Sequence, residues 1–309
     1  MMELFFLGTG SGVPSKERNV SSLALRMLEE RGTTWIFDCG EGTQHQILNT
    51  NLRPRRIEVI FITHLHGDHI YGLPGLLSSR SFQGGESPVT VYGPAGLKEY
   101  IDWSLRLSGT HLRYPLRVVE IKEGMLFEDD QFIVEAVKLQ HGLESYGYLL
   151  KEKDRLGELQ PHRLKELGIQ PGPIYQTIKE QETTRLEDGR VIHRSDVLGP
   201  AEKGRKLAIL GDTRYLPSLA DKLQLVDVLV HEATFAGDEE QMAYDYYHST
   251  VKQAASLADA AGAGELILNH VSSRYQGKAV EQLAEEARSI FPNTTIAHDF
   301  YRHTISRNR

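Results

Sequence analysis

The sequence predicts an α/β protein of stacked sheets and helices, on the basis of two regularities. Short apolar runs rich in β-branched residues alternate with amphipathic helical patterns, which is typical of α/β layers. Five of these runs lead directly into a polar residue, and they are VIFI (59–62), FIVEAVKL (132–139), KLAIL (206–210), DVLV (227–230) and ELIL (265–268). Ligand sites in α/β proteins gather at strand ends, because a rigid scaffold can aim side chains there. We therefore expect the functional residues at the ends of these five strands.

The composition is that of an ordinary globular protein, with 309 residues, 40% of them hydrophobic and 25% charged. No run approaches the ~18 apolar residues of a membrane-spanning helix, and the N-terminus lacks the basic segment of a signal peptide. A single cysteine, Cys39, excludes an internal disulfide and a thiolate cluster. We expect a cytoplasmic protein with no membrane partner. The net charge of −7 alone disfavours nucleic-acid binding, but bound cations would add positive charge that this sum omits.

The first predicted strand leads into GTGSG (8–12), a glycine-rich loop. The loop lacks the spacing of a dinucleotide-binding motif and the lysine of a P-loop. We therefore interpret it as a tight turn rather than a phosphate cradle.

The predicted strand 59–62 leads into HLHGDH, with four potential metal ligands in six positions. His64 and His66 are two residues apart, so an extended chain points both side chains the same way. Gly67 allows a sharp turn, which presents Asp68 and His69 on a neighbouring face before a helical pattern begins. Imidazole and carboxylate are the ligands that zinc accepts when thiolates are absent, and manganese is a weaker candidate.

Three later strands end in further candidate ligands, His141, Asp212 and His270. Taken singly, each histidine reads as an ordinary hydrogen-bonded residue, and Asp212 in GDTR reads as a turn or cap residue. Together with HLHGDH they make seven ligands, which suits two metal ions that share one carboxylate.

Residues 151–205 break the layered pattern, because they are polar, rich in glycine and proline, and poor in aliphatic clusters. We expect this segment to bury little and to protrude. Two interpretations stay open, a tolerated surface insertion and an arm that grips a partner.

THLHGDH, with His141, GDT and NH at their positions, resembles the metallo-β-lactamase superfamily. Within it the chain resembles the ribonuclease Z family over essentially its whole length, through FLGTGSGVPSKERN, FDCGEGTQHQ, HGDHIYGLPGLL, GIQPGP, ILGDTR, HEATF, HST, NHVSSRY and AHDF. The resemblance implies one domain over 1–309, a four-layer αββα metallo-β-lactamase sandwich, with a flexible tRNA-binding arm inserted at 151–205. It also implies a cytoplasmic homodimer in which the arm of one subunit helps to bind the precursor tRNA that its partner cleaves.

The resemblance implies two Zn²⁺ ions per subunit, with Mn²⁺ as the alternative metal. It places one ion on His64, His66 and His141, the other on Asp68, His69 and His270, and Asp212 between the two. Two such ions can share a water and lower its pKa, and the resulting hydroxide attacks the phosphodiester. By family analogy Asp68 also orients or deprotonates this nucleophile.

His248 is the candidate proton donor to the leaving 3′ oxygen. It stands just before Ser249 and Thr250, which are typical of the N-cap of the helix VKQAASLADAAG, closed by Gly262. The resemblance implies that Glu232, in HEAT, holds the imidazole in the right tautomer and favours its charged form. Without the resemblance, His248 reads as a surface histidine of YDYYHST.

Three groups of residues are candidates for binding RNA. Lys16 and Arg18 of PSKERN can neutralise phosphates, and Asn19 can bind a base or the backbone. Arg274 and Tyr275 can clamp the scissile phosphate or stack a base. On the arm, the candidates are Arg163, Lys165 and the turn GIQPGP. A plain solvated loop is the alternative for each group.

The implied reaction is endonucleolytic cleavage of precursor tRNA after its discriminator nucleotide, leaving a 3′-hydroxyl on the tRNA and a 5′-phosphate on the trailer. One alternative is another phosphodiesterase or small-molecule hydrolase of the superfamily, which would not need PSKERN or the arm. A second is a non-catalytic, zinc-stabilised RNA-binding protein, although a retired site need not keep all seven ligands.

Overall fold

A computed structural model describes residues 2–307 and divides them into two compact units. The larger unit comprises residues 2–151 and 205–306, and the smaller comprises 152–204 with Arg307. Each unit has its own hydrophobic core.

Two seven-stranded sheets make up the centre of the larger unit. The first has the order β18-β1-β3-β4-β5-β6-β7, with strands Arg302–Ile305, Met2–Gly8, Ser22–Met27, Thr33–Phe37, Ile57–Phe61, Val89–Gly93 and Leu116–Glu120. The second has the order β17-β15-β14-β13-β10-β9-β8, with strands Thr294–Ile296, Glu265–Asn269, Val228–Glu232, Lys206–Ile209, Glu144–Glu152, Phe132–Gln140 and Gly124–Glu128. All five strands predicted to lead into polar residues are present.

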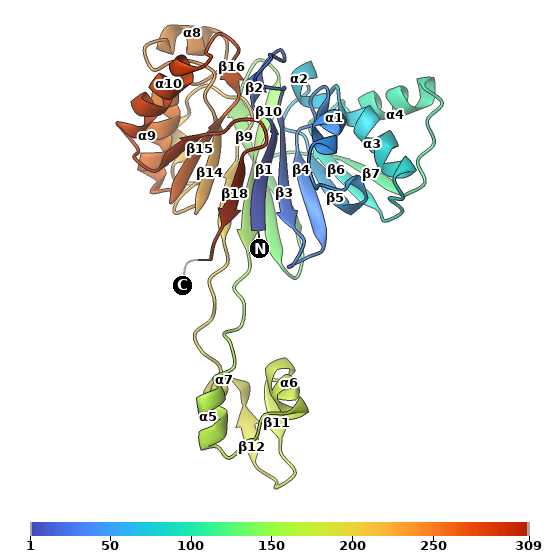
Figure 1. The fold of residues 1–309 in the computed structure, drawn as a ribbon, viewed down its shortest axis with the longest axis vertical. Helices are drawn as coiled ribbons and strands as arrows, with labels where there is room; N and C mark the ends of the chain where they lie inside the picture. The colour runs from blue at the N-terminus through green and yellow to red at the C-terminus, as the bar shows by residue number, and fades with distance from the viewer. Residues whose placement is uncertain (1, 308–309) are drawn as a thin grey trace. The chain divides into compact units, whose positions relative to one another are not determined.

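Helices cover the outer face of each sheet, as Figure 1 shows. The first sheet is covered by α1 (Thr43–Leu48), α3 (Leu73–Phe82) and α4 (Leu97–Leu107), and the second by α9 (Val251–Ala261) and α10 (Lys278–Arg288). Three cores fill the spaces, one between the sheets and one beneath each helical layer. This is the predicted four-layer αββα sandwich.

Strand β5 illustrates why the central strands read as unbroken apolar runs. Val59 and Phe61 pack into the core between the sheets, whereas Ile60 and Ile62 pack beneath the helices. Successive side chains of a strand point to opposite faces, so a strand covered on both faces is apolar throughout.

The relative directions of the strands bring the polar residues together. In the first sheet β5 is parallel to β4 and β6, and in the second β13, β14 and β15 are parallel to one another. Their carboxyl ends therefore meet at one edge of each sheet. The short strands β2 (Gly10–Ser11) and β16 (Val271–Ser272) pair at this end of the unit, which brings the GTGSG loop beside the segment after His270.

The remaining short elements of the larger unit lie in its connections. They are α2 (Gly67–Ile70), α8 (Glu240–Asp245), and the 3-10 helices η1 (Pro54–Arg56) and η2 (Pro217–Leu219). Helix α9 begins at the predicted place, with a capping box between Thr250 and Gln253, and ends at Gly262 in the left-handed conformation.

The smaller unit contains α5 (Pro161–Glu166), α6 (Pro173–Glu180), α7 (Arg194–Val197) and a hairpin of β11 (Thr183–Arg185) and β12 (Val191–His193). It encloses a small core, made of Leu164, Ile169, Ile178, Ile192 and Val197. Most residues of this segment are exposed, as predicted, but its few buried side chains meet in a core of their own, which was not predicted. Each of its short elements contributes only one or two aliphatic residues, so no window of the sequence shows a cluster. Over residues 2–307, no helix is long and apolar enough to cross a membrane.

Candidate active site

The HLHGDH turn passes from β5 into α2 and carries three histidines and one aspartate of the site. His66 is the residue before α2, and Gly67 begins the helix. A Cβ on Gly67 would lie 2.2 Å from the exposed ring of Tyr71, so a larger residue here would have to displace that ring.

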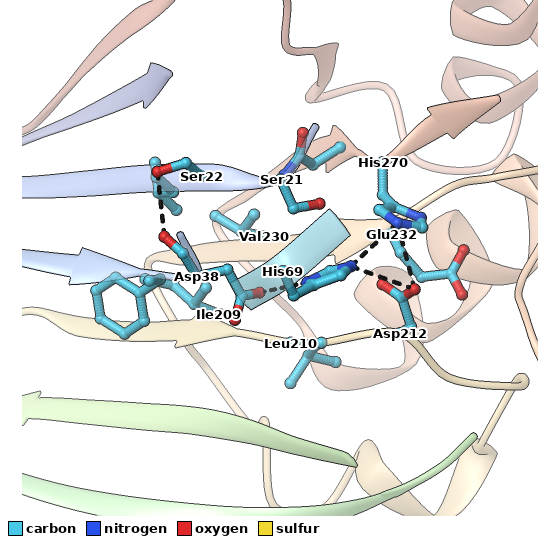
Figure 2. A pocket seen from close by; sticks show the side chains of 14 residues that line it. Ser21, Ser22, Asp38, His69, Ile209, Leu210, Asp212, Val230, Glu232 and His270 are labelled. Carbon is cyan, nitrogen blue, oxygen red and sulfur yellow. Dashed lines mark hydrogen bonds and ion pairs between the residues drawn. The ribbon is translucent and has the colours of Figure 1, made fainter. Parts of the chain in front are cut away.

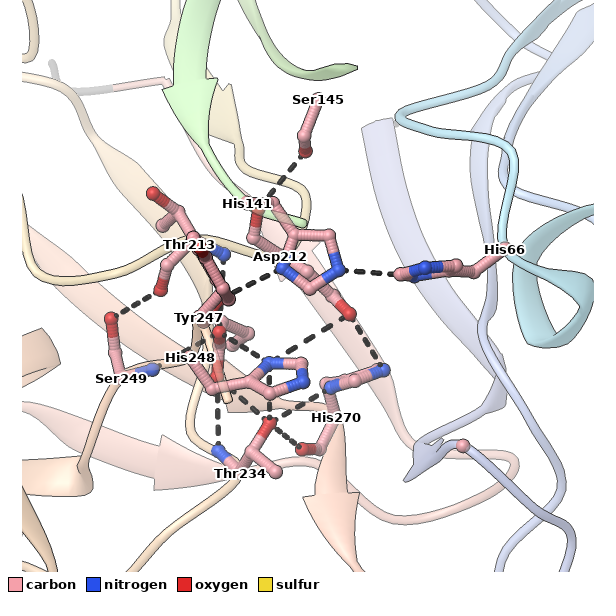
Figure 3. A network of polar contacts seen from close by, with 12 residues as sticks. His66, His141, Ser145, Asp212, Thr213, Thr234, Tyr247, His248, Ser249 and His270 are labelled. Carbon is pink, nitrogen blue, oxygen red and sulfur yellow. Dashed lines mark hydrogen bonds and ion pairs between the residues drawn. The ribbon is translucent and has the colours of Figure 1, made fainter. Parts of the chain in front are cut away.

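The first donor cluster joins His64, His66 and His141. The Nδ1 atom of His66 lies 3.0 Å from Nε2 of His64. It also lies 3.0 Å from Nε2 of His141 (Figure 3). His141 follows β9 of the second sheet, so the two sheets contribute jointly to this cluster. Three imidazole nitrogens that converge in this way form one side of a metal site.

The second donor cluster joins Asp68, His69 and His270. The Oδ2 atom of Asp68 lies 3.5 Å from Nε2 of His69 and 3.4 Å from Nε2 of His270. The two imidazole nitrogens are themselves 3.3 Å apart.

Asp212 lies between the two clusters. Its Oδ2 atom is 3.7 Å from Nε2 of His64. The same atom is 3.6 Å from Nε2 of His69 and 3.2 Å from Nε2 of His270 (Figure 2). One carboxylate thus reaches donors of both clusters, and all seven residues predicted as ligands converge.

On the side of the first sheet, the Nδ1 atoms of His64 and His69, which point away from the donor clusters, contact oxygen atoms of the protein. Nδ1 of His64 lies 3.0 Å from the Thr63 hydroxyl, and Nδ1 of His69 lies 2.7 Å from Oδ2 of Asp38. The Thr63 hydroxyl and amide both donate to Asp38, at 2.9 and 2.8 Å. Asp38 therefore supports the turn that carries His64 and His69.

On the side of the second sheet, His141 and His270 are held in the same way. Nδ1 of His141 lies 2.8 Å from the Tyr247 carbonyl oxygen, and Nδ1 of His270 lies 2.9 Å from the Thr234 hydroxyl. These contacts place the imidazole proton on Nδ1 and leave Nε2 free for a metal ion, as is usual for metal-binding histidines. The donor set therefore fits a metal centre on the evidence of its hydrogen bonds.

Backbone strain is also concentrated here. Asp38, Tyr247 and His270 have positive φ angles of 56°, 61° and 57°. Non-glycine residues rarely adopt this conformation, and it persists where the surrounding structure imposes it, often at functional sites.

The electrostatics of the clusters suit ionised carboxylates, whereas the imidazoles differ from one another. Burial would lower the pKa of His69, but the charges and hydrogen bonds of Asp212 and Asp38 outweigh it and raise that pKa well above its usual range. Burial lowers the pKa of His64, His66 and His141, which favours their neutral, metal-binding form. Burial would raise the pKa of Asp68 and Asp212. The hydrogen bonds and charges of the neighbouring histidines outweigh this effect and hold both pKa values below the usual range.

His248 and Glu232 form a pair at the edge of the centre. Nδ1 of His248 lies 2.8 Å from Oε1 of Glu232 and 3.8 Å from Oδ2 of Asp212. Burial lowers the pKa of His248, but the charge and hydrogen bond of Glu232 outweigh it and raise the pKa to about 9. The pair can therefore keep a protonated imidazole at neutral pH beside the donor clusters.

Comparisons with known proteins decide the family. The chain is 58% identical over 306 residues to the ribonuclease Z of Bacillus licheniformis, with 99% of this chain and 100% of that one aligned. It is 60% identical over 306 residues to the ribonuclease Z of Anoxybacillus flavithermus, covering 99% of this chain and 98% of that one. The chain belongs to the ribonuclease Z family.

Other similarities agree with membership of the ribonuclease Z family. The crystal structure of human tRNase Z, short form, matches with a TM-score of 0.70 and 31% identity, over 99% of this chain and 100% of that one. A model described as beta-lactamase superfamily domain matches residues 173–271, and one described as anti-Pycsar protein Apyc1 matches residues 2–156. The family's fold and the clustered donors together support a divalent metal cofactor.

The PSKERN loop is one of the motifs that carry the ribonuclease Z resemblance. Its side chains only partly match the RNA-binding role that the sequence predicted for them. Lys16 is exposed, as expected. Arg18 is buried, and its guanidinium donates to the Thr9 hydroxyl at 2.7 Å and to the Ala297 carbonyl at 2.6 Å. Arg18 therefore braces the loop from inside instead of facing a phosphate. The Asn19 side chain donates to the Glu41 carbonyl at 2.8 Å, so it ties two loops together.

Arg274 and Tyr275 also have protein partners in the structure. Arg274 is exposed and forms an ion pair with Glu239 at 3.1 Å. The Tyr275 hydroxyl donates to Glu239 and accepts from the Ala236 amide at 3.0 Å, and its ring packs against the core beneath α9 and α10. The hydroxyl and one side of the Tyr275 ring are therefore held by the protein, and base stacking by Tyr275 stays a prediction.

Arg163 and Lys165 lie on α5 of the smaller unit and are exposed. The structure thus groups them separately from the donor clusters, as the arm interpretation requires. Reasoning from sequence missed the roles of Thr63 and Thr234. Their only signal is position, since Thr63 directly precedes His64 and Thr234 lies two residues after Glu232.

Proposed function

We propose that this protein is a zinc-dependent endoribonuclease that cleaves precursor tRNA after the discriminator nucleotide. The products are a tRNA with a 3′-hydroxyl and a trailer with a 5′-phosphate. The observation that carries the proposal is near-complete alignment with ribonucleases Z at 58–60% identity, in a chain whose seven donors converge.

Two metal ions per subunit are part of this proposal. His64, His66 and His141 would hold one ion, Asp68, His69 and His270 the other, and Asp212 would contact both. Imidazole and carboxylate donors without thiolates suit zinc, with manganese as the weaker candidate. When bound, two such ions lower the pKa of a shared water and neutralise the charge of the phosphodiester.

The protein's own groups then divide the acid and base roles. Asp68 is a catalytic residue that orients the attacking water, and the Gly12 amide donates to its Oδ2 at 2.8 Å and fixes that oxygen. His248 gives its proton to the leaving 3′ oxygen. Glu232 is a positioning residue, because it keeps the His248 ring oriented and charged.

Substrate binding away from the cut is assigned to the smaller unit. Residues 151–205 serve as the tRNA-binding arm, with Arg163, Lys165 and the GIQPGP turn as contacts, and Lys16 contributes at the cleavage site. The subunits pair as a homodimer, so that the arm of one subunit binds tRNA cleaved by the other. Basic groups on a contacting surface suffice for RNA binding in an acidic protein.

The decisive experiment incubates the purified protein with a precursor tRNA that lacks an encoded CCA, with zinc supplied, and maps both new ends. We expect cleavage directly after the discriminator nucleotide, its loss on chelation and its return with zinc. Cleavage elsewhere, or no cleavage with zinc present, would refute the substrate assignment. Asp68→Ala should abolish cleavage, and a variant that still cleaves would refute the proposed mechanism.

Deletion of residues 155–200 separates this proposal from a general phosphodiesterase of the superfamily. We expect precursor cleavage to be lost while hydrolysis of bis(p-nitrophenyl) phosphate persists. Retained precursor cleavage would show that the arm is only an insertion.

A further inference from the structure

Three tyrosines with exposed rings lie in the four residues before His248. The exposed fractions of Tyr244, Tyr246 and Tyr247 are 58%, 66% and 37%, so none of them serves mainly to fill a core. Exposed aromatic clusters usually mark a surface that binds something.

Arg214 lies between two of these rings. Its guanidinium carbon is 3.7 Å from the ring centroid of Tyr244 and 3.7 Å from that of Tyr247. Two rings cannot occupy the same face of one guanidinium at this distance, so the three groups form a stack. The Arg214 Nε atom also donates to the Tyr244 carbonyl at 2.6 Å, which holds the stack in place before any ligand arrives.

The stack begins at the metal centre. The ring of Tyr247 meets that of His141 edge-on, with centroids 6.5 Å apart, and the Tyr247 carbonyl accepts from His141 (Figure 3). Tyr247 also directly precedes His248, the group that protonates the leaving oxygen. An in-line displacement places the leaving oxygen opposite the attacking water, so a group beside His248 lies on the leaving side of the phosphate.

We propose that Tyr244, Arg214 and Tyr247 form a stacking platform that binds the base of the nucleotide whose 3′ oxygen leaves, the discriminator nucleotide. This inference rests on the proposed function and adds a subsite to it. Aromatic rings and guanidinium planes are the surfaces on which proteins stack unpaired RNA bases. Stacking accepts any base, so the platform would register the position of the terminal nucleotide without selecting its identity.

An abasic substitution in the RNA tests the platform directly. Three precursors are compared: one unmodified, one abasic at the discriminator position, and one abasic at the third trailer nucleotide. For the wild-type protein we expect the abasic discriminator to reduce kcat/KM roughly 5- to 100-fold, equivalent to about 1–3 kcal/mol of lost stacking. The abasic trailer nucleotide should have a smaller effect.

The protein variants complete the test. Tyr244→Ala should lower cleavage of the unmodified precursor and abolish the difference between it and the abasic one, whereas Tyr244→Phe, which keeps the ring, should behave as wild type. Tyr246→Ala is the matched control, because Tyr246 is the most exposed of the three rings and lies against Phe235 outside the stack. It should keep the wild-type sensitivity to the abasic site.

Hydrolysis of bis(p-nitrophenyl) phosphate distinguishes a stack that binds a base from one that only positions Tyr247 and His141. Tyr244→Ala should leave this reaction near the wild-type rate, since the substrate has no base. An equal loss on both substrates would mean that the stack only positions Tyr247 and His141, and would overturn the proposal. Equal cleavage of unmodified and abasic precursors by the wild type would also overturn it. A wild type that cleaves neither would instead refute the proposed function.

Discussion

Glu232→Gln should move the alkaline limb of the pH–rate profile to lower pH. Glu232 is buried, and its Oε1 atom lies 2.8 Å from Nδ1 of His248. Its charge is the main influence that raises the pKa of His248 to about 9 against the opposing effect of burial. Glutamine is nearly isosteric but uncharged, so the variant loses the largest influence that raises the pKa of His248 and keeps the smaller one of Asp212.

The size of the effect follows from the two pKa values. The difference between about 9 and the ordinary value of 6.5 corresponds to about 3 kcal/mol of stabilisation of the charged imidazole. At pH 8 the wild-type imidazole is mostly protonated, whereas one with an ordinary pKa is only about 3% protonated. We therefore expect a loss of about 30-fold at pH 8 from protonation alone, and a much smaller loss near pH 6. Bound cations would lower the pKa of His248 in both proteins, so the prediction concerns the displacement between the two profiles.

The assay measures single-turnover cleavage of precursor tRNA between pH 5.5 and 9.5 with saturating zinc. Hydrolysis of bis(p-nitrophenyl) phosphate is the comparison, because p-nitrophenolate leaves without a proton and should lose less in the variant. Metal content and circular dichroism establish that the variant is folded and loaded. Coincident alkaline limbs for wild type and Glu232→Gln would refute the assignment of His248 as an acid controlled by Glu232.

Three further outcomes follow from the packing around the site. Thr234→Val should weaken metal binding roughly 10- to 100-fold in chelator competition, because His270 loses its hydrogen-bond partner. Thr234→Ser keeps the hydroxyl and should bind metal as the wild type does. Equal metal affinities for all three proteins would contradict this prediction. Asp38→Asn should fold, since asparagine tolerates the positive φ angle at this position, but elemental analysis should find less zinc than in the wild type. Full zinc occupancy in this variant would argue against the support of His69 by Asp38. Gly40→Ala should lower the free energy of unfolding in urea by about 1–3 kcal/mol, because its Cβ would lie 2.2 Å from a backbone oxygen of Asp68. Gly142→Ala is the control, because a Cβ at Gly142 has no neighbour within 4 Å, and its free energy of unfolding should equal that of the wild type.

Much of the architecture could be predicted from strand ends alone. The apolar runs before His64, His141, Asp212 and His270 are all strands, and their directions bring these residues to one place. A strand buried on both faces leaves a strong local signal, and a rigid sheet translates that signal into position.

Contacts between distant loops left no such signal. Arg18 reads as a solvent-facing cation in PSKERN, but its partner Ala297 is 279 residues away and the contact buries it. Tyr275 reads as a free ring until Glu239 and Ala236 are placed against its hydroxyl. In both cases the fold, rather than the local sequence, decides whether a polar side chain faces solvent.

Glu232 shows how one buried carboxylate can couple two parts of a reaction. Its Oε1 atom holds His248, and its Oε2 atom accepts from the Thr234 hydroxyl at 2.8 Å, which in turn holds His270. The amides of Thr213, Thr234 and Ser249 also donate to it, each at 3.1 Å, so neither oxygen can rotate without losing partners. A displacement of Glu232 would therefore disturb the proton donor and a proposed metal ligand together. Thr234→Val removes the partner of His270 and one hydrogen bond to Glu232, but it keeps the Glu232 charge beside His248. A Thr234→Val protein that loses metal but keeps the wild-type alkaline limb would therefore separate the two effects that Glu232→Gln combines.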